Sequence, residues 1–268
     1  IRVYFATRPK SDSDLKYISR SGYVDLDRKN LTQIINISEK PLFEIGSPGS
    51  FDEFGAMTSC FINVGKKVYG YYTGWSRLQT VPYTMAIGLA ISSDGGDTFK
   101  KISEGPILGQ TEKEPFLLSG PKIIIENGLW HMWYLVGTKW LNHNGKYEPV
   151  YKFAHAKSKD GISWERNGIP IIPSKFKDEC QVSFSVFRHN DKWNAIFAYR
   201  KPLDFREASD GSYRLGYVYS NDLETWHRDD DKIGIDVSKD GWDSQMLAYP
   251  NISEIDGKKY LFYCGNEF

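Results

Sequence analysis

The sequence predicts an all-β fold, a five-bladed β-propeller of four-stranded antiparallel blades whose first and last blades are incomplete in this chain. Three observations support this prediction. Aromatic-rich segments recur at a nearly constant spacing, Asp-centred turns recur at the same spacing, and no segment shows an amphipathic helical period of useful length. A β-sandwich is the alternative, because short strands joined by turns also describe that fold. The agreement of two independent repeats favours the propeller, as a single domain over residues 1–268.

Aromatic strands provide the first repeat. Their equivalent positions are Phe5, Tyr72, Tyr134, Ala198 and Tyr263, which lie 67, 62, 64 and 65 residues apart in the sequence. A second β-rich run precedes four of these strands, at residues 60–64, 122–125, 184–187 and 251–255. A short polar turn joins each run to its aromatic strand, so each pair predicts a hairpin.

Asp-centred turns provide the second repeat. Residues 93–99, 158–164 and 220–226 each contain a strand end, an Asp-containing turn and an aromatic residue soon after it. A further strand precedes each turn, at residues 87–91, 153–157 and 215–219. Asp and Gly favour the tight turn, and the aromatic residue starts the next strand. One unit of about 65 residues therefore contains four strands.

The two ends of the sequence lack parts of this unit. Ile1 leads directly into an aromatic strand, so the first blade has no inner strand. The last blade stops at Phe268 without its third and fourth strands. We therefore expect a ring of five blades that is trimmed at both ends.

Composition excludes several classes of function. The protein has 34 basic and 34 acidic residues, which argues against a general nucleic-acid binder. No run of 18 apolar residues predicts a membrane span, and no signal peptide is visible. The three cysteines have no CxxC spacing, so they predict neither a zinc site nor a redox pair, and free thiols favour a cytoplasmic location. No cofactor motif is present, and the sequence gives no oligomeric state.

Carboxylates occur at one register of the repeat. Seven residues before the residues that open three inner strands (Ser59, Pro121 and Pro250) lie Asp52, Glu114 and Asp243. The fourth blade has Asp178 and Glu179 shortly before Phe184. Residues that precede the inner strands converge on one mouth of a propeller channel, where crowded carboxyl groups divide into acids and bases. Glycoside hydrolysis needs that division between two carboxyl groups.

A structural role is the alternative for these acids, since a repeated Asp can cap a turn or pair with Arg without any chemistry. Aromatic residues nearby are candidates for stacking on sugar rings, although each single ring is also a normal core or rim residue. Arg200 closes an aromatic strand and is a candidate for orienting carboxylates. The candidate substrate-binding residues are Trp75, Glu114, Trp140, Asp178, Arg200, Trp242 and Tyr249.

These residues carry a resemblance to a known group of proteins. The segments 49–55, 72–75, 87–96, 158–164, 178–179 and 241–250 resemble the five-bladed propellers related to glycoside hydrolase families 43, 32 and 130, including a subgroup of hypothetical glycosidases. The resemblance covers nearly the whole sequence. It implies Asp52 as base or nucleophile, Glu179 as acid and Asp243 or Glu114 as helper. It also implies a calcium ion in the central channel as an option, which no local loop motif predicts.

Two departures from the family pattern occur at these strands. Gly120 precedes Pro121 where the enzymes usually have Asp, and the segment after Glu179 lacks the usual proline. Two hypotheses therefore stay open. One is a glycosidase that uses Asp52, Glu179 and Asp243, with inversion favoured over retention. The other is a non-catalytic carbohydrate-binding propeller or the donor-handling domain of a polysaccharide-assembly enzyme. Both of these hypotheses predict a carbohydrate ligand. A protein-interaction propeller, which does not, ranks third.

Overall fold

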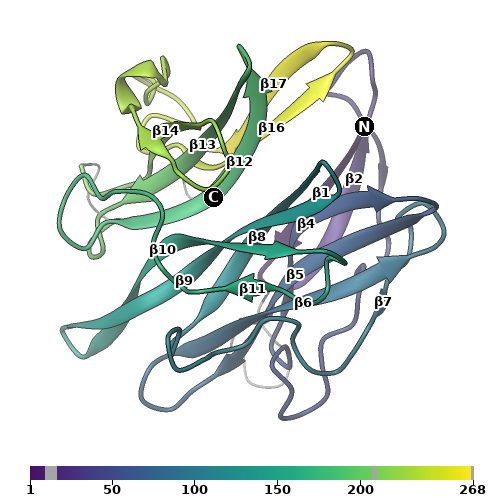
Figure 1. Cartoon of the computed structure of the whole chain (residues 1–268), viewed down its shortest axis with the longest axis horizontal. Coiled ribbons are helices and arrows are strands. Elements are labelled where there is room, and N and C mark those ends of the chain that lie inside the picture. The colour runs from purple at the N-terminus through teal and green to yellow at the C-terminus, as the bar shows by residue number, and fades with distance from the viewer. Residues whose placement is uncertain (10–16, 207–209, 267–268) are drawn as a thin grey trace. The chain divides into compact units, whose positions relative to one another are not determined.

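The computed structural model describes residues 1–9, 17–206 and 210–266, and strands dominate it (Figure 1). Within these ranges, the one helical segment is a single 3₁₀ turn at Asp230–Lys232. It occupies the acidic run after the last strand of the fourth blade. No helix in the described ranges is long and apolar enough to cross a membrane.

Three sheets contain four strands each, in sequence order. Their members are β4 (Ala56–Val64), β5 (Lys67–Arg77), β6 (Tyr83–Ser92) and β7 (Lys100–Lys101); β8 (Leu118–Glu126), β9 (Leu129–His143), β10 (Lys146–Ser158) and β11 (Glu165–Arg166); and β12 (Cys180–His189), β13 (Lys192–Arg200), β14 (Arg214–Ser220) and β15 (His227–Arg228). The predicted four-stranded antiparallel unit is confirmed.

The first and last sheets are smaller. β1 (Arg2–Thr7), β2 (Arg20–Leu26) and β3 (Ile34–Ile37) form a three-stranded sheet, and β16 (Ala248–Ile255) pairs with β17 (Lys258–Cys264). β1 and β17 are the first and last aromatic strands of the predicted repeat. The expected incomplete blades are therefore confirmed as these two smaller sheets.

The protein packs as two compact units, each with its own core. Unit 1 comprises residues 1–111, 117–124 and 160–164, and unit 2 comprises residues 112–116, 125–159 and 165–268. In unit 1, Tyr72 and Phe43 are buried, and the Tyr4 ring stacks on Phe61 with 3.6 Å between the ring centroids. Stacked and edge-to-face aromatic pairs of this kind explain where part of the aromatic surplus is used.

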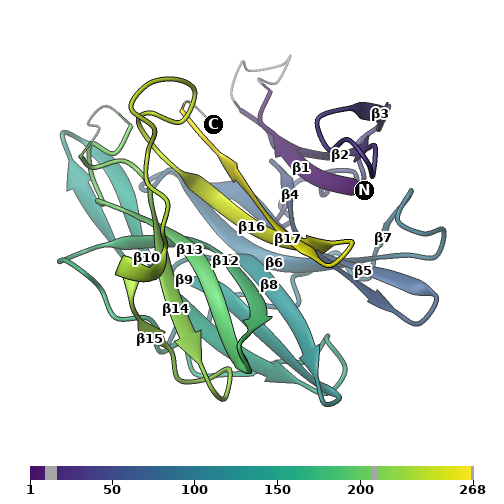
Figure 2. The same cartoon turned by 90° about the horizontal axis from the view of Figure 1, so that it is seen from above.

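Unit 2 has an aromatic core of the same kind. Trp133 on β9 packs against Phe184 on β12 and Trp226 next to β15, with ring centroids 5.4 and 5.8 Å away. Figure 2 shows the β16–β17 hairpin beside β12, where the backbone N–H of Ile252 donates to Ser185 Oγ at 2.7 Å. The blades of β9 and β12 thus share an aromatic core, and the blades of β12 and β16 share a hydrogen bond.

The Asp-centred turns have the expected chemistry. Asp94 accepts hydrogen bonds from the Ser92 hydroxyl at 2.6 Å and from the backbone N–H of Thr98 at 3.0 Å. Asp222 accepts from the backbone N–H of Thr225 at 2.7 Å, and such bonds lower the pKa of Asp222 to about 2. The carboxylate therefore fixes the turn between the third and fourth strands of the sheet.

Three of the inner strands share a bulge near their N-terminal ends. The pairing register shifts between Thr58 and Cys60 in β4, and equivalent shifts occur in β12 and β16. At these points Ser183 and Tyr249 both have φ of 52°, a left-handed conformation that is uncommon for residues other than glycine. Strained backbone and bulges both cluster at functional sites. The N-terminal ends of these strands are therefore candidates for the functional site.

Candidate functional site

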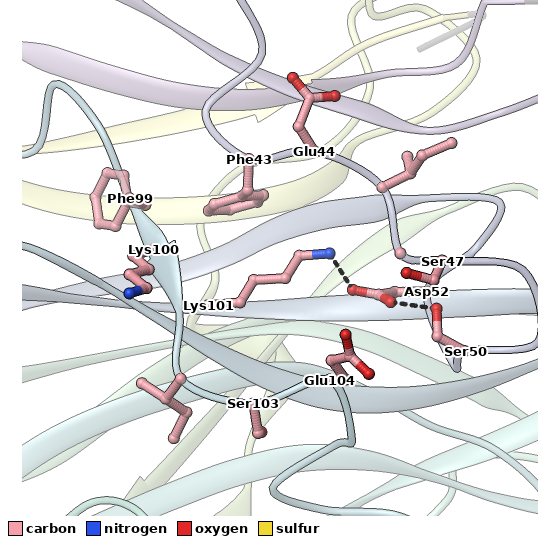
Figure 3. Close-up of a pocket in the computed structure, with 13 residues that line it drawn as sticks. Phe43, Glu44, Ser47, Ser50, Asp52, Phe99, Lys100, Lys101, Ser103 and Glu104 are labelled. Atoms are coloured by element: carbon pink, nitrogen blue, oxygen red, sulfur yellow. Dashed lines mark hydrogen bonds and ion pairs between the residues drawn. The ribbon is translucent and has the colours of Figure 1, made fainter.

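Asp52 lies in the loop before β4 and is 1% exposed. Its carboxylate accepts a hydrogen bond from the Ser50 hydroxyl at 3.0 Å and pairs with Lys101 Nζ at 2.5 Å (Figure 3). It also accepts a hydrogen bond from the Tyr72 hydroxyl at 3.1 Å. Burial and the neighbouring carboxylate hold the pKa of Tyr72 far above its ordinary value, so its hydroxyl remains a donor. The negative charge of Asp52 is thus compensated inside its own blade.

Glu114 repeats this arrangement before β8. It is buried, it accepts a hydrogen bond of 2.5 Å from the Tyr134 hydroxyl, and it forms an ion pair with Arg166 on β11. Gly168 lies against it with φ of 69°, and a Cβ at that position would come within 2.5 Å of Glu114 Cγ. A glycine is therefore required beside this buried carboxylate.

Glu179 directly precedes β12 and is fully buried. Arg228 on β15 donates to both carboxylate oxygens, at 2.8 and 2.9 Å from Nη1. The repeat has Ala198 where three other blades have a tyrosine, and Gln181 supplies the missing hydrogen bond at 2.9 Å. The backbone N–H of Lys175 donates a further bond at 2.9 Å.

Asp243 precedes β16 and is 7% exposed. It accepts a 2.8 Å hydrogen bond from Tyr263, the equivalent of Tyr72 and Tyr134. Hydrogen bonds from Ser238 and Tyr263 hold the pKa of Asp243 below its usual value, so it is ionised at neutral pH. Among the described residues, no Lys or Arg forms an ion pair with it.

The cationic partners follow a regular rule that the sequence analysis missed. Each is the second residue of a two-residue fourth strand and lies two positions after the aromatic residue of the Asp-centred turn. The aromatic and cationic residues are Phe99 and Lys101, Trp164 and Arg166, and Trp226 and Arg228. That constant offset of two was visible in the sequence. In the blades of Asp52 and Glu114, the acid before the first strand thus bonds to a tyrosine of the second strand and to a cation of the fourth.

This environment favours the structural alternative for Asp52, Glu114 and Glu179. An adjacent cation and hydrogen bonds to the charged form stabilise a carboxylate, whereas a general acid must hold a proton before the reaction. Burial also separates the oxygens of Glu114 and Glu179 from a ligand. The catalytic roles of Asp52, Glu179 and Asp243 stay a prediction.

A channel calcium ion does not fit these residues. Calcium takes six to eight oxygen ligands, several of them carboxylates. Here the oxygens of Asp52, Glu114 and Glu179 are already bound to cationic side chains. Across the described ranges, no group of three or more His, Cys, Asp or Glu side chains is arranged to hold a metal ion.

Two of the predicted aromatic residues are exposed. Trp242 is 61% exposed, and its indole stacks on Tyr263 with 5.1 Å between centroids and 21° between planes. Tyr249 is 43% exposed and contacts Tyr213, with 5.8 Å between centroids. Trp242 lies in the segment that leads into β16 and Tyr249 is the second residue of that strand, so unit 2 presents two supported aromatic rings to solvent.

The other predicted binding residues have internal partners. Trp75 is half-buried and donates to Ser19 Oγ at 3.0 Å, and Trp140 is half-buried opposite Pro149. Asp178 pairs with Lys139 at 2.6 Å. Arg200 is buried and donates to the hydroxyls of Tyr151 and Tyr213 and to backbone carbonyls. Arg200 thus bonds to tyrosines rather than to a carboxylate in this structure, and its role in a ligand site stays a prediction.

The second half of the sequence matches a known family. Residues 116–267 match the glycosyl hydrolases family 32 N-terminal domain. The protein belongs to this family. A relative from Mycobacterium tuberculosis (strain CDC 1551 / Oshkosh), the uncharacterized protein MT1551, is 31% identical over all 268 residues, which cover 84% of its length.

Solved structures show the same fold as this family 32 domain. A thermostable family-43 glycoside hydrolase has a TM-score of 0.63 at 15% identity, over 98% of this protein and 79% of that one. β-1,2-Mannobiose phosphorylase from Listeria innocua, solved with β-1,2-mannobiose, has a TM-score of 0.63 at 14% identity, over 94% of this protein and 65% of that one. The predicted five-bladed propeller is thereby confirmed, and the protein is a glycoside hydrolase- and phosphorylase-like propeller.

Proposed function

We propose that this protein binds an oligosaccharide or polysaccharide through a surface of unit 2 that is centred on Trp242 and includes Tyr249. The observation that carries the proposal is the exposed indole of Trp242, which is held by neighbouring groups rather than left as a mobile side chain. Trp and Tyr are enriched at interfaces because each combines an apolar ring with a polar group, and an indole face is suited to stack on the apolar C–H face of a sugar ring.

The support of Trp242 comes from the end of the following hairpin. Gly265 lies against the indole, and a Cβ at that position would come within 2.3 Å of a ring carbon. Asn266 donates its backbone N–H to the Trp242 carbonyl at 2.6 Å, and its side-chain oxygen accepts from the backbone N–H of Gln245 at 2.8 Å. A preorganised ring loses little freedom when a ligand binds, which increases affinity.

The family membership supports a carbohydrate as the ligand. The family 32 match includes the whole segment that carries Trp242 and Tyr249. Structures with the same fold contain sugars, including β-1,2-mannobiose in the Listeria enzyme. The buried, paired carboxylates of Asp52, Glu114 and Glu179 favour binding without hydrolysis over catalysis by this set.

A glycan-array screen followed by calorimetric titration tests this function. We expect Trp242→Ala to weaken binding of the strongest hit by roughly five- to tenfold, in line with about 1–1.5 kcal/mol for an aromatic contact. Tyr260→Ala is the matched control, because Tyr260 is an exposed aromatic residue on the same hairpin. Absence of any glycan ligand, or equal binding by wild type and Trp242→Ala, would overturn the proposal.

A second candidate is glycan cleavage, and one observation favours it. Asp243 is ionised, and in the described part of the protein it has no cationic partner, so it is chemically suited to act as a base or nucleophile. We expect any turnover of array hits to be lost in Asp243→Asn. The predicted acid Glu179 would have to separate from Arg228 during that reaction. If turnover persists in Asp243→Asn, the residue is not the base or nucleophile.

A further inference from the structure

Unit 1 contains a cavity whose residues are distinct from those of the aromatic surface of unit 2. Its volume is about 430 Å³, within the range of small-molecule sites. The walls come from residues 43–52, ahead of β4, and from residues 99–104, around β7. Figure 3 shows Phe43 and Phe99 along one side and the Asp52–Lys101 ion pair at its centre. All of the lining residues belong to unit 1.

The lining combines donors, acceptors and an apolar wall. Lys101 has three N–H donors, and its one hydrogen bond to a described residue is to Asp52, so two donors remain for a ligand. Ser47 contributes a hydroxyl, and Glu104 contributes carboxylate oxygens as acceptors. A sugar ring has the complementary chemistry, with hydroxyls that donate and accept around its edge and an apolar C–H face.

Charge narrows the class of ligand. Two lysines, Lys100 and Lys101, line the cavity together with three carboxylates, Glu44, Asp52 and Glu104. This set has no positive excess, so it does not favour a phosphate or another anion. A neutral polyhydroxyl ligand satisfies the donors and acceptors without adding charge.

The repeat provides a substitution that probes the cavity. The equivalent fourth-strand residues of the next two blades are Arg166 and Arg228, whose larger guanidinium groups contact Glu114 and Glu179. Lysine has a smaller head group, so Lys101→Arg would add bulk beside Asp52. The cavity also lies outside residues 116–267, the segment that matches the family.

We propose that this cavity is a second carbohydrate subsite, which takes one neutral pyranose residue against Phe99 and hydrogen-bonds it through Lys101, Ser47 and Glu104. It extends the proposed glycan-binding function and rests on that function for the class of ligand. Its residues do not include Trp242 or any other residue of unit 2, so the two sites are separable by mutation.

The test is saturation-transfer NMR and calorimetry with methyl β-D-mannopyranoside and methyl β-D-glucopyranoside. Lys101→Arg adds bulk to the wall of the cavity while it keeps the type of ion pair that two other blades contain. Ser47→Phe blocks the cavity from an exposed loop position. We expect both variants to weaken pyranoside binding at least tenfold with little change in Tm, and we expect Lys66→Ala, in the exposed β4–β5 turn, to behave as wild type.

Two comparisons decide the outcome. Trp242→Ala should leave methyl pyranoside binding intact while it weakens the array ligand. Inorganic phosphate should not compete with the pyranoside. Unchanged binding in both Lys101→Arg and Ser47→Phe, or competition by phosphate, would remove the cavity as a sugar subsite. Loss of array binding in Trp242→Ala would then still support the proposed function, so failure of one proposal is distinguishable from failure of the other.

Discussion

At the residue scale, the main finding is that each buried carboxylate has its own set of donors. Arg166 illustrates the energetics, because it compensates a glutamate that is only 1% exposed. A buried pair adds little net stability relative to apolar residues, but removal of one partner leaves an uncompensated charge.

We therefore predict that Arg166→Ala destabilises the protein by about 3–5 kcal/mol, because Glu114 is left buried without its cation. Urea unfolding followed by circular dichroism measures the effect. Arg166→Lys should recover most of the loss, since Lys101 performs the same task beside Asp52. A loss below about 1 kcal/mol in Arg166→Ala would mean that Glu114 does not depend on its partner.

The two stacked histidines of unit 2 give a pH dependence at the same scale. His155 Nε2 lies 3.1 Å from His131 Nδ1, and burial together with that neighbour lowers the pKa of His155 to about 4. In the unfolded protein, His155 becomes protonated as the pH falls below about 6.5. The buried, neutral His155 ring therefore contributes fully to the free energy of unfolding above pH 6.5, and this contribution is lost as the pH falls toward 4.

We expect the free energy of unfolding to fall by about 2 kcal/mol between pH 6.5 and 4 because of His155, after allowance for partial exposure of the ring. Unfolding curves at several pH values measure this slope. His155→Phe should flatten it, whereas His189→Phe, at an exposed strand end, should not. An unchanged slope in His155→Phe would contradict the assignment.

At the element scale, the Asp-centred turns and the fourth strands act together. Each fourth strand is two residues long, so its position depends on the turn before it rather than on its own ladder of hydrogen bonds. The turn fixes the aromatic residue, and the cation follows two residues later. A loosened turn should therefore also weaken the ion pair of the same blade.

We predict that Asp222→Ala lowers stability by about 1–2 kcal/mol, because the backbone N–H groups of Glu224 and Thr225 lose their acceptor. Hydrogen exchange should show faster opening of β15. Since the pKa of Asp222 is lowered to about 2, its contribution is present above about pH 4 and is lost as the pH falls toward 2. Asp240→Ala, at an exposed position, is the control, and equal effects of the two variants would contradict the prediction.

At the scale of the whole molecule, the blades are repeated modules. Glu114 bonds to residues of β9 and β11, whereas Glu179 bonds to residues of β12 and β15 and to the loop before β12. These partners are different residues in the two blades. Substitutions without shared partners usually add in their effect on stability.

We expect Glu114→Gln and Glu179→Gln to destabilise the protein additively, to within about 0.5 kcal/mol, in a double-mutant cycle. Chemical unfolding of the two single variants and the double variant measures the coupling. The pair Glu179→Gln and Arg228→Met is the comparison, and it should be strongly coupled. A coupling well above 0.5 kcal/mol between the two glutamates would show that the acids form one shared cluster.

The sequence by itself determined the repeat, the four-stranded unit, the Asp-centred turns and the common register of the acids. These features are local, because strand patterning and turn chemistry depend on residues a few positions apart. Sequence reasoning missed the cations, although the offset of two from Phe99, Trp164 and Trp226 was constant. Their importance was hidden because Lys and Arg near a strand end are usually surface residues.

Only the tertiary structure decided what the acids contact and which aromatic rings are exposed. A carboxylate at a given register can face a ligand or an internal cation, and the difference depends on residues distant in the sequence, such as Lys101 for Asp52 and Arg228 for Glu179. Trp242 and Trp75 look alike in the sequence, yet one indole is exposed to solvent while the other is half-buried and donates to Ser19. Burial and pairing are properties of the packed blade, and they decide which chemistry a side chain can perform.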